Sequence, residues 1–461
     1  MKQTSTGISY NGITEGVIWK QLLKFFFPIM FGTLFQQLYN TADAIIVGQF
    51  LGKEALAAVG GGTATACNLL IGFFVGLSSG ATVIISQYYG AKDEEKISSA
   101  VHNAMALAIT SGLLVSVAGY FLSEPLLLAI NTPVDILPLA VQYMHIYFGG
   151  ALITVMYNIG SAIFRAFGDS RHPLYFLIVG CLTNVVLDLL FVGLLKWGIR
   201  GAAYATVLSQ CVPLAMVLIA LKRRKDCCRL EFKKIRFEKD MLKRTLYIGF
   251  PAGIQSIMYS ISNLLLQSSI NSFGTDSAAA WAAYGKLDAV YWMIINAFGV
   301  AITTFVGQNY GAGHMKRSRK GVTDTIILSF IFTAVIEFIF LTFGRQCYYL
   351  FTSDENVIEI GVQIMNCIAP FFFTFICIEV LSGAIRGTGK ALIPTLISVL
   401  GICGLRILWL QVVTPRVEGL YGVITVYPFS WIVTGLLFII YYLKGNIFPK
   451  EEESEVALQD K

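Results

Sequence analysis

Long apolar runs, separated by short polar segments, dominate the chain. Most runs have about 20 residues or more, the length that an α-helix needs to cross a bilayer. They do not show the strict alternation over about 10 residues that is typical of a membrane β-barrel. The pattern predicts twelve membrane-spanning helices, at about 25–47, 56–87, 98–122, 137–164, 173–195, 201–221, 246–272, 278–309, 320–343, 357–385, 392–413 and 418–444.

The composition supports an all-α integral membrane protein. Of the 461 residues, 56% are hydrophobic and 13% are charged, whereas soluble domains carry about 25% charged residues. The first apolar run is not expected to be a signal peptide, because it is too long, contains Asp43 and lacks a small-residue cleavage site. The nine cysteines and four histidines show no metal-ligand spacing, so no structural metal or cofactor is expected.

The basic residues predict the orientation. With the N-terminus inside, 27 of the 34 lysines and arginines fall in inner segments and 5 in outer segments. The positive-inside rule therefore places both termini in the cytoplasm, with the chain passing several times through the plasma membrane. The net charge of +6 reflects this topology, and no nucleic-acid partner is expected.

Short motifs recur in the second half of the chain at an offset of about 221 residues. "SQYYGA" at 86–91 returns as "GQNYGA" at 307–312, and the "R-x-x-G-x-x-x-x-P" of 165–173 returns at 386–394. "FP" at 27–28 also returns, at 250–251. Each copy would hold six spans, so both copies enter the membrane from the same side and are related by an axis along the membrane normal.

This repeat predicts two parallel six-helix lobes with a cleft between them, the arrangement of alternating-access carriers. An old duplication without a mechanical role is the less favoured interpretation. The expected divisions are an N-lobe at 1–221, a basic linker at 222–244, a C-lobe at 245–445 and an acidic cytoplasmic tail at 446–461.

Two acids lie within apolar segments of the N-lobe. Asp43 in "YNTADAIIVGQF" and Asp188 in "CLTNVVLDLLFV" are expected about 6 Å and about 10 Å below the outer ends of their helices, at 1.5 Å per residue. Asn40 precedes Asp43 by three residues and Asn184 precedes Asp188 by four, which places each pair on one helical face. Four oxygen-bearing side chains could therefore converge at one level.

Two carboxylates in an apolar site cannot easily both carry charge, so the pair should take up a proton or recruit a cation. The alternative is that each acid only caps or bridges neighbouring helices, but acids inside membranes are functional by default. Shifted by the repeat offset, Asp43 corresponds to Leu266 and Asp188 to Trp409. The acids therefore belong to the task of one lobe.

The twelve spans, the parallel duplication and the ordered motifs resemble the MATE (multidrug and toxic compound extrusion) family, over about residues 20–445. The first helix, "F-P-x-x-x-x-x-x-x-Q-x-x-Y-N-x-x-D", and the "N-x-x-x-D" of the fifth add to the match. The resemblance implies a monomeric antiporter that exports organic cations or amphipathic compounds in exchange for H⁺ or Na⁺. It also implies a coupling site at Asp43, Asp188 and Asn184, with a tyrosine near Tyr143 in the N-lobe cavity.

A pocket for bulky amphipathic cations needs aromatic and methionine surfaces with a few polar anchors. Aromatic residues at helical spacing more often only pack, so each residue is a separate hypothesis. The candidates are Gln36, Tyr39, Tyr143, Asn158, Met258, Asn263 and Met293.

Several alternatives stay open at this point. A flippase for a lipid-linked precursor could share the architecture, although only Lys286 and Arg406 could offer positive charge within the spans. An intramembrane enzyme would need a catalytic cluster, and no such cluster stands out. The sequence does not decide between H⁺ and Na⁺. Other charged residues in the second half are expected to form inter-helix ion pairs, namely Lys286, Asp288, Glu337, Glu379 and Arg406.

Overall fold

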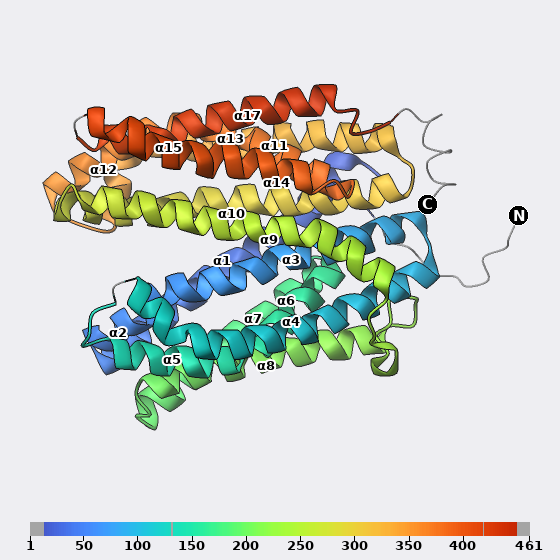
Figure 1. The fold of residues 1–461 in the computed structure, drawn as a ribbon, viewed down its shortest axis with the longest axis horizontal. Coiled ribbons are helices and arrows are strands. Elements are labelled where there is room, and N and C mark those ends of the chain that lie inside the picture. The colour runs from blue at the N-terminus through green and yellow to red at the C-terminus, as the bar shows by residue number, and fades with distance from the viewer. Residues whose placement is uncertain (1–12, 131, 418, 450–461) are drawn as a thin grey trace, which may run out of the picture.

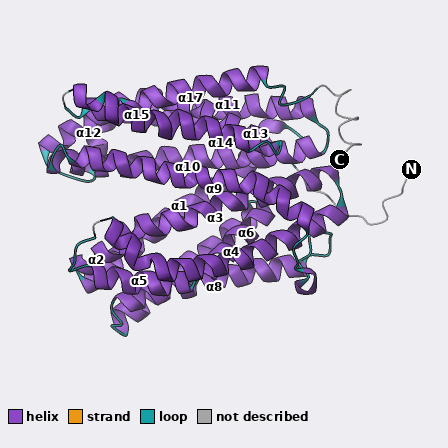
Figure 2. Cartoon of the chain, in the orientation of Figure 1, coloured by secondary structure: helices purple, strands orange, loops and turns teal. Residues whose placement is uncertain are grey.

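The computed structural model describes residues 13–130, 132–417 and 419–449, and these segments are helical with no strand (Figures 1 and 2). The first half of the chain contains α1 (Ile18–Leu51), α2 (Lys53–Gly60), α3 (Gly62–Ala91), α4 (Glu94–Ala129), α5 (Leu137–Gly149), α6 (Ala151–Ala166), α7 (Arg171–Asp188) and α8 (Ile199–Arg223). The second half contains α9 (Lys239–Asn271), α10 (Thr275–Gly311), α11 (Met315–Tyr349), α12 (Glu355–Ile368), α13 (Phe372–Gly387), α14 (Leu392–Ser398), α15 (Leu405–Val412), α16 (Tyr421–Ile424) and α17 (Val426–Lys444).

The helices confirm the all-α membrane fold. Within the described segments, nine helices or joined helices are long and apolar enough to span a membrane, and α5 with α6, bent by 51°, makes ten. The remaining two predicted spans lie in α1 and α9, which have 34 and 33 residues. These two helices contain polar side chains along their length. The sequence did not predict the bend between α5 and α6, or the π-helical turns at Leu189–Leu194 and Val399–Gly404.

The two halves of the chain form two groups of helices that lie side by side (Figure 1). Their element order matches, because α1, α3, α4, α5–α6, α7 and α8 correspond to α9, α10, α11, α12–α13, α14–α15 and α17. We call the groups the N-lobe and the C-lobe. In Figure 1 they approach each other at the end where both chain termini lie, here the terminal end, and diverge toward α2 and α12.

The first helix of each lobe begins against the other lobe. Phe25 and Phe26 of α1 pack in the main apolar cluster of the C-lobe, and the ring of Phe26 stacks on that of Phe298 at 4.0 Å. In the same way, Met241 and Ile248 of α9 pack in the apolar cluster of the N-lobe. The helices α1 and α9 therefore cross the boundary between the lobes, and each contains a proline close to the crossing.

The lobes touch along a seam in which α3 packs against α9 and α10. Small residues permit this close approach. A Cβ atom on Gly76 would lie 2.6 Å from Cα of Gly253, and one on Gly80 would lie 2.3 Å from the carbonyl oxygen of Thr245. Any side chain at these positions would force the two helices apart.

At the terminal end the seam carries two reciprocal hydrogen bonds, which we call the glutamine clamp. Gln87 donates from Nε2 to the carbonyl oxygen of Gly387 at 2.9 Å. Gln308 donates from Nε2 to the carbonyl oxygen of Ala166 at 2.7 Å. Both donors and both acceptors are related by the repeat offset of 221, so the recurring "Q-x-Y-G-A" motif links each lobe to the other.

The clamp has one asymmetric addition. The backbone N–H of Ile13 donates to Oε1 of Gln308 at 2.9 Å, and Arg317 donates to the carbonyl oxygens of Ile13 and Gly16. The start of the described chain is thus fixed to the C-lobe before α1 enters the seam.

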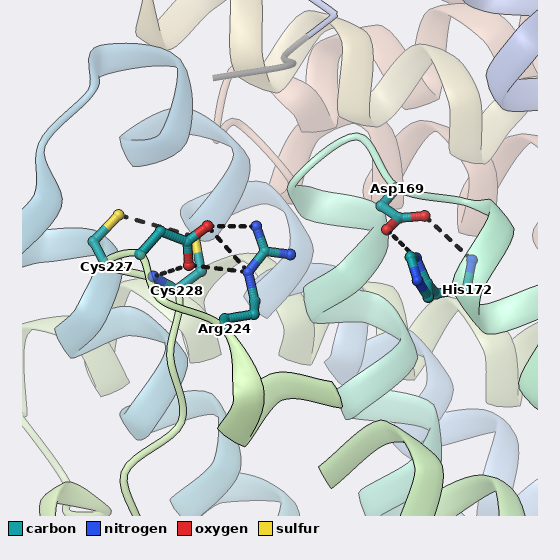
Figure 3. A network of polar contacts seen from close by, with 6 residues as sticks. Asp169, His172, Arg224, Cys227 and Cys228 are labelled. Carbon is teal, nitrogen blue, oxygen red and sulfur yellow. Dashed lines mark hydrogen bonds and ion pairs between the residues drawn. The ribbon is translucent and has the colours of Figure 1, made fainter. Parts of the chain in front are cut away.

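Between α8 and α9 the chain forms a loop over 224–238, with a 3₁₀ turn at Phe232–Lys234. Arg224 donates to both carboxylate oxygens of Asp226, and Cys228 N–H donates to the same carboxylate (Figure 3). Burial raises the pKa of Asp226, but the hydrogen bonds and charge of Arg224 outweigh burial and hold it below its usual range. Figure 3 also shows Asp169 accepting a hydrogen bond from His172 nearby.

Candidate transport site

Two acidic side chains meet inside the N-lobe, and we call them the acid pair. Asp43 of α1 is 8% exposed, and Asp188, the last residue of α7, is fully buried. Beyond Asp188 the helix continues as the π-helical turn Leu189–Leu194, a wide turn that is frequent at functional sites. Because α1 packs along α7 and this turn, the two carboxyl groups lie close enough to interact electrostatically.

The acid pair and Asn184 leave several polar atoms unpaired. Oδ1 of Asp43, both carboxylate oxygens of Asp188 and both amide atoms of Asn184 are buried, and none has a hydrogen-bond partner within the described segments. Buried polar atoms nearly always have a partner, because an unpaired one costs free energy. A proton shared by the carboxylates, or a small cation held by these oxygens, would remove that cost.

Tyrosine rings surround the acid pair. Tyr39 of α1 lies within electrostatic range of both acids and of Tyr147, with Thr206 of α8 beside it. Tyr143 lies within the same range of Asp43, and its ring stacks on that of Tyr147 with centroids 6.0 Å apart. The sequence analysis did not single out Tyr147 or Thr206. The spacing of Tyr147, four residues after Tyr143 on α5, was the available signal.

The other candidate residues differ from the acid pair in burial. Asn40 and Gln36 are exposed, and the amide of Asn40 donates to Gln37 on the same helix. Asn158, Met258 and Met293 are half-buried. The structure therefore places Asp43, Asp188, Asn184, Tyr39 and Tyr143 in one group, and a role for the other candidates stays a prediction.

The duplication is also visible in comparison with known proteins. The sequence profile of the MatE family matches residues 28–190 and 251–410, one copy in each half of the chain. The chain belongs to the MatE family. Its members are membrane transporters, so this MatE protein is a transporter and not an enzyme.

Curated relatives match over most of this MatE chain. The probable multidrug resistance protein YpnP of Bacillus subtilis is 31% identical over 394 residues, which cover 85% of this chain and 88% of the relative. The probable multidrug resistance protein YoeA of the same organism is 28% identical over 435 residues, or 92% and 93% of the two chains. A solved structure described as the outward-facing conformation of a multidrug resistance MATE family transporter has the same fold, with a TM-score of 0.88 at 23% identity, over 97% of this chain and 100% of that one.

The C-lobe of the MatE protein holds a different polar region, a cavity of about 440 Å³ that we call the C-lobe cavity. Its walls come from α9, α10, α12, α13, α15 and α17 and from the π-helical turn at Val399–Gly404, and three of the six tryptophans line it. Asn263 lies here, so this candidate is separated from the N-lobe candidates. The lining residues are Tyr259, Asn263, Gln267, Trp281, Tyr284, Gly285, Asp288, Trp292, Asn296, Ile368, Phe375, Glu379, Ile402, Arg406, Tyr427 and Trp431.

The expected inter-helix ion pairs do not form in the described C-lobe. Lys286 is exposed, and Oε2 of Glu337 is buried without a partner in that part of the chain. Arg406 donates from a terminal guanidinium nitrogen to Oδ1 of Asn263 at 3.0 Å, and Asp288 accepts from Nε1 of Trp292 at 2.5 Å. Neutral hydrogen-bond partners thus take the place of opposite charges.

Proposed function

We propose that this MatE protein is a secondary active antiporter that exports organic cations or amphipathic drugs in exchange for H⁺ or Na⁺. The observation that carries the proposal is the set of buried, unpaired oxygens on Asp43, Asp188 and Asn184. A site of this kind binds a cation strongly in one conformation and releases it when water enters, which is the differential affinity that coupling requires.

The distribution of basic residues supports a plasma-membrane orientation with both termini in the cytoplasm. The terminal end, with the seam and the glutamine clamp, is then cytoplasmic. In this arrangement the protein is closed toward the cytoplasm, and the acid pair is reached from outside.

The proposed cycle starts from this state. The acid pair takes up H⁺ or Na⁺ from outside, and loss of its net charge allows the outer part of α1 to repack against α7. Repacking releases the exported substrate, and the lobes then rock to open the terminal end. Substrate binding from the cytoplasm or the inner leaflet, followed by cation release, returns the lobes to the present arrangement.

The substrates follow from both the site and the relatives. Tyr39, Tyr143 and Tyr147 lie around the acid pair, and aromatic rings attract organic cations. YpnP and YoeA carry the description of probable multidrug resistance proteins. The protein is proposed to work as a single chain, because each lobe supplies its half of the seam.

The test is dye efflux from proteoliposomes that contain the purified protein, driven separately by a pH gradient and by a Na⁺ gradient. We expect efflux of a cationic dye under one gradient, and loss of that efflux in Asp43→Asn and in Asp188→Asn. Asp276→Asn, at an exposed acid in the first turn of α10, is the matched control. Undiminished gradient-driven efflux in both acid-pair variants would overturn the coupling role of the pair.

A further inference from the structure

The C-lobe cavity is suited in size to a small-molecule ligand. Its volume of about 440 Å³ falls within the range of about 300–1,000 Å³ that is usual for ligand pockets. It lies within one lobe rather than in the seam, and it is separate from the acid pair on α1 and α7.

Two opposite charges face this cavity without pairing with each other. Arg406 is 4% exposed, and its Nε is buried without a hydrogen-bond partner in the described chain. Oδ1 of Asp288 is likewise buried and unpaired. No ion pair within 4.0 Å joins these two residues, although both line the same space. Each therefore has one buried polar atom that the described chain leaves unsatisfied.

Neighbouring residues hold both charged groups in place. The guanidinium of Arg406 lies over the ring of Tyr427 at 4.3 Å and donates to Asn263. The other carboxylate oxygen of Asp288 accepts from Trp292. These contacts fix the two groups on different walls, and they use only part of the hydrogen-bonding capacity of each.

A second acid, Glu379, also lines the cavity. It interacts electrostatically with Arg386 on the same helix, and Arg386 does not line the cavity. Among the charged residues of the cavity, Asp288 and Arg406 are the two that each have a buried polar atom without a hydrogen-bond partner in the described chain, so they are the two that a ligand would have to satisfy.

Aromatic rings line the cavity around the two charged groups. The centroids of Trp281 and Tyr427 are 5.5 Å apart, and Trp292 meets Phe375 edge to face at 4.7 Å. Flat ring systems stack favourably against such walls.

We propose that the C-lobe cavity binds a planar aromatic zwitterion. Its cationic group lies beside the carboxylate of Asp288, its anionic group lies beside the guanidinium of Arg406, and its ring packs against the aromatic residues that line the cavity. A simple organic cation would leave the guanidinium without an opposite charge, and a simple anion would leave the carboxylate without one. The site therefore selects a ligand by two charges, whereas the acid pair of the N-lobe offers negative charge alone.

The test is equilibrium binding to the purified full chain in detergent, measured by fluorescence polarisation. The probes share one ring frame. Unsubstituted rhodamine has a cationic xanthylium and a free carboxylate, its methyl ester is a cation, and fluorescein is an anion. We expect the zwitterionic dye to bind about tenfold more tightly than the ester or fluorescein, because it alone satisfies both charged groups.

Two variants make the test specific. Arg406→Gln should reduce the affinity for the zwitterionic dye to that for the ester. Gly285→Leu should weaken binding of the zwitterionic dye by about tenfold, because the new side chain fills the cavity. A Cβ at Gly285 meets no atom within 4 Å, so this variant should fold even if Arg406→Gln does not. Lys286→Gln, which removes an exposed positive charge on the same helix, is the matched control and should change nothing.

Two results would overturn the proposal. One is equal affinity of the wild-type protein for the zwitterion and the ester. The other is unchanged affinity in a Gly285→Leu protein whose thermal unfolding matches that of the wild type. Because binding needs no gradient, a failure of the antiport experiment would leave this result standing, and the reverse also holds.

Discussion

The two lobes are alike where they touch and unlike where they hold polar groups. At the terminal end, Gln87 and Gln308 make the same hydrogen bond to equivalent carbonyl groups. In the interior, the N-lobe holds the acid pair, and the C-lobe holds a cavity lined by one arginine and two acids, Arg406, Asp288 and Glu379. The two copies thus share the hydrogen bonds at the seam and differ in the polar groups of their interiors.

At the positions equivalent to the acid pair, the C-lobe has a leucine and a tryptophan. Leu266 is fully buried in a small apolar cluster, and Trp409 donates from Nε1 to the carbonyl oxygen of Gly422 while its ring packs on Phe429. Apolar packing fills the space that carboxylates hold in the other lobe. In the proposed antiport cycle the ion would therefore bind in one lobe only, whereas both lobes would move.

The largest effect expected from this comparison is at Asp188. In Asp188→Asn, gradient-driven efflux of a cationic dye should fall by about a hundredfold, within the usual range of coupling between sites. Asp288→Asn, the same change in the C-lobe, should leave efflux of that dye within about threefold, because the buried charge there does not belong to the coupling site. Initial rates in proteoliposomes, normalised to the amount of inserted protein, give both values.

Equal losses in the two variants would contradict the division of roles between the lobes. Asp324→Asn, at a half-buried acid in the inner part of α11, controls for a general effect of losing a carboxylate.

The next effect concerns the seam, where the lobes should respond alike. A Cβ on Gly90 would lie 1.9 Å from the carbonyl oxygen of Gln308, and one on Gly311 would lie 2.0 Å from that of Gln87. Gly90→Ala and Gly311→Ala should each destabilise the closed seam by about 1–3 kcal/mol, the usual cost of overpacking. Distances between spin labels on the two lobes at the terminal end should then shift toward the open arrangement.

Gly60→Ala is the control for this pair, because a Cβ at Gly60 meets no atom within 4 Å. A shift in only one of the two seam variants would show that the two sides of the seam are not mechanically equivalent.

A smaller and unequal effect is expected within the glutamine clamp. Gln308→Leu removes hydrogen bonds to both Ala166 and Ile13, whereas Gln87→Leu removes the one to Gly387. At about 1 kcal/mol for each hydrogen bond, the closed population should fall more in the first variant. The same spin-label distances measure both, and Gln346→Leu, at an exposed glutamine on α11, is the control. A larger shift in Gln87→Leu would contradict the asymmetry.

The smallest effect is expected at the tyrosines around the acid pair. Tyr143→Phe and Tyr147→Phe keep the ring stack, so the affinity for the rhodamine methyl ester should fall by about threefold or less. Tyr147→Ala removes the ring and should weaken binding by a larger factor. If Tyr147→Phe reduced the affinity as much as Tyr147→Ala, the contribution of Tyr147 to dye binding would come from its hydroxyl group and not from its ring.

Much of this organisation could be predicted from the sequence. Apolar length gave the spans, the offset of 221 gave the two lobes, and the rarity of buried acids singled out Asp43 and Asp188. These signals are local or periodic, so one chain is enough to detect them.

The rest depends on how helices dock. The sequence contains the "Q-x-Y-G-A" motif twice, but it does not show that each glutamine bonds to the opposite lobe. Asn40 shares a helical face with Asp43 by spacing, yet it is exposed, because the packing of α1 buries only part of that face. The C-lobe cavity is assembled from six helices, so no local pattern could place Trp292 in the same cavity as Arg406.

The crossing of α1 and α9 has a mechanical consequence. The beginning of each lobe's first helix packs in the other lobe, so α1 and α9 both span the joint between the lobes. In the proposed cycle the lobes rock, so the part of each helix before the crossing would move with one lobe and the part after it with the other. The torsion would then be taken up along the helix near Pro28 and Pro251, which lack the backbone hydrogen bond that stiffens neighbouring turns. Asp43 lies on the part of α1 beyond Pro28, so a change in its charge would apply a force to the joint from a distance.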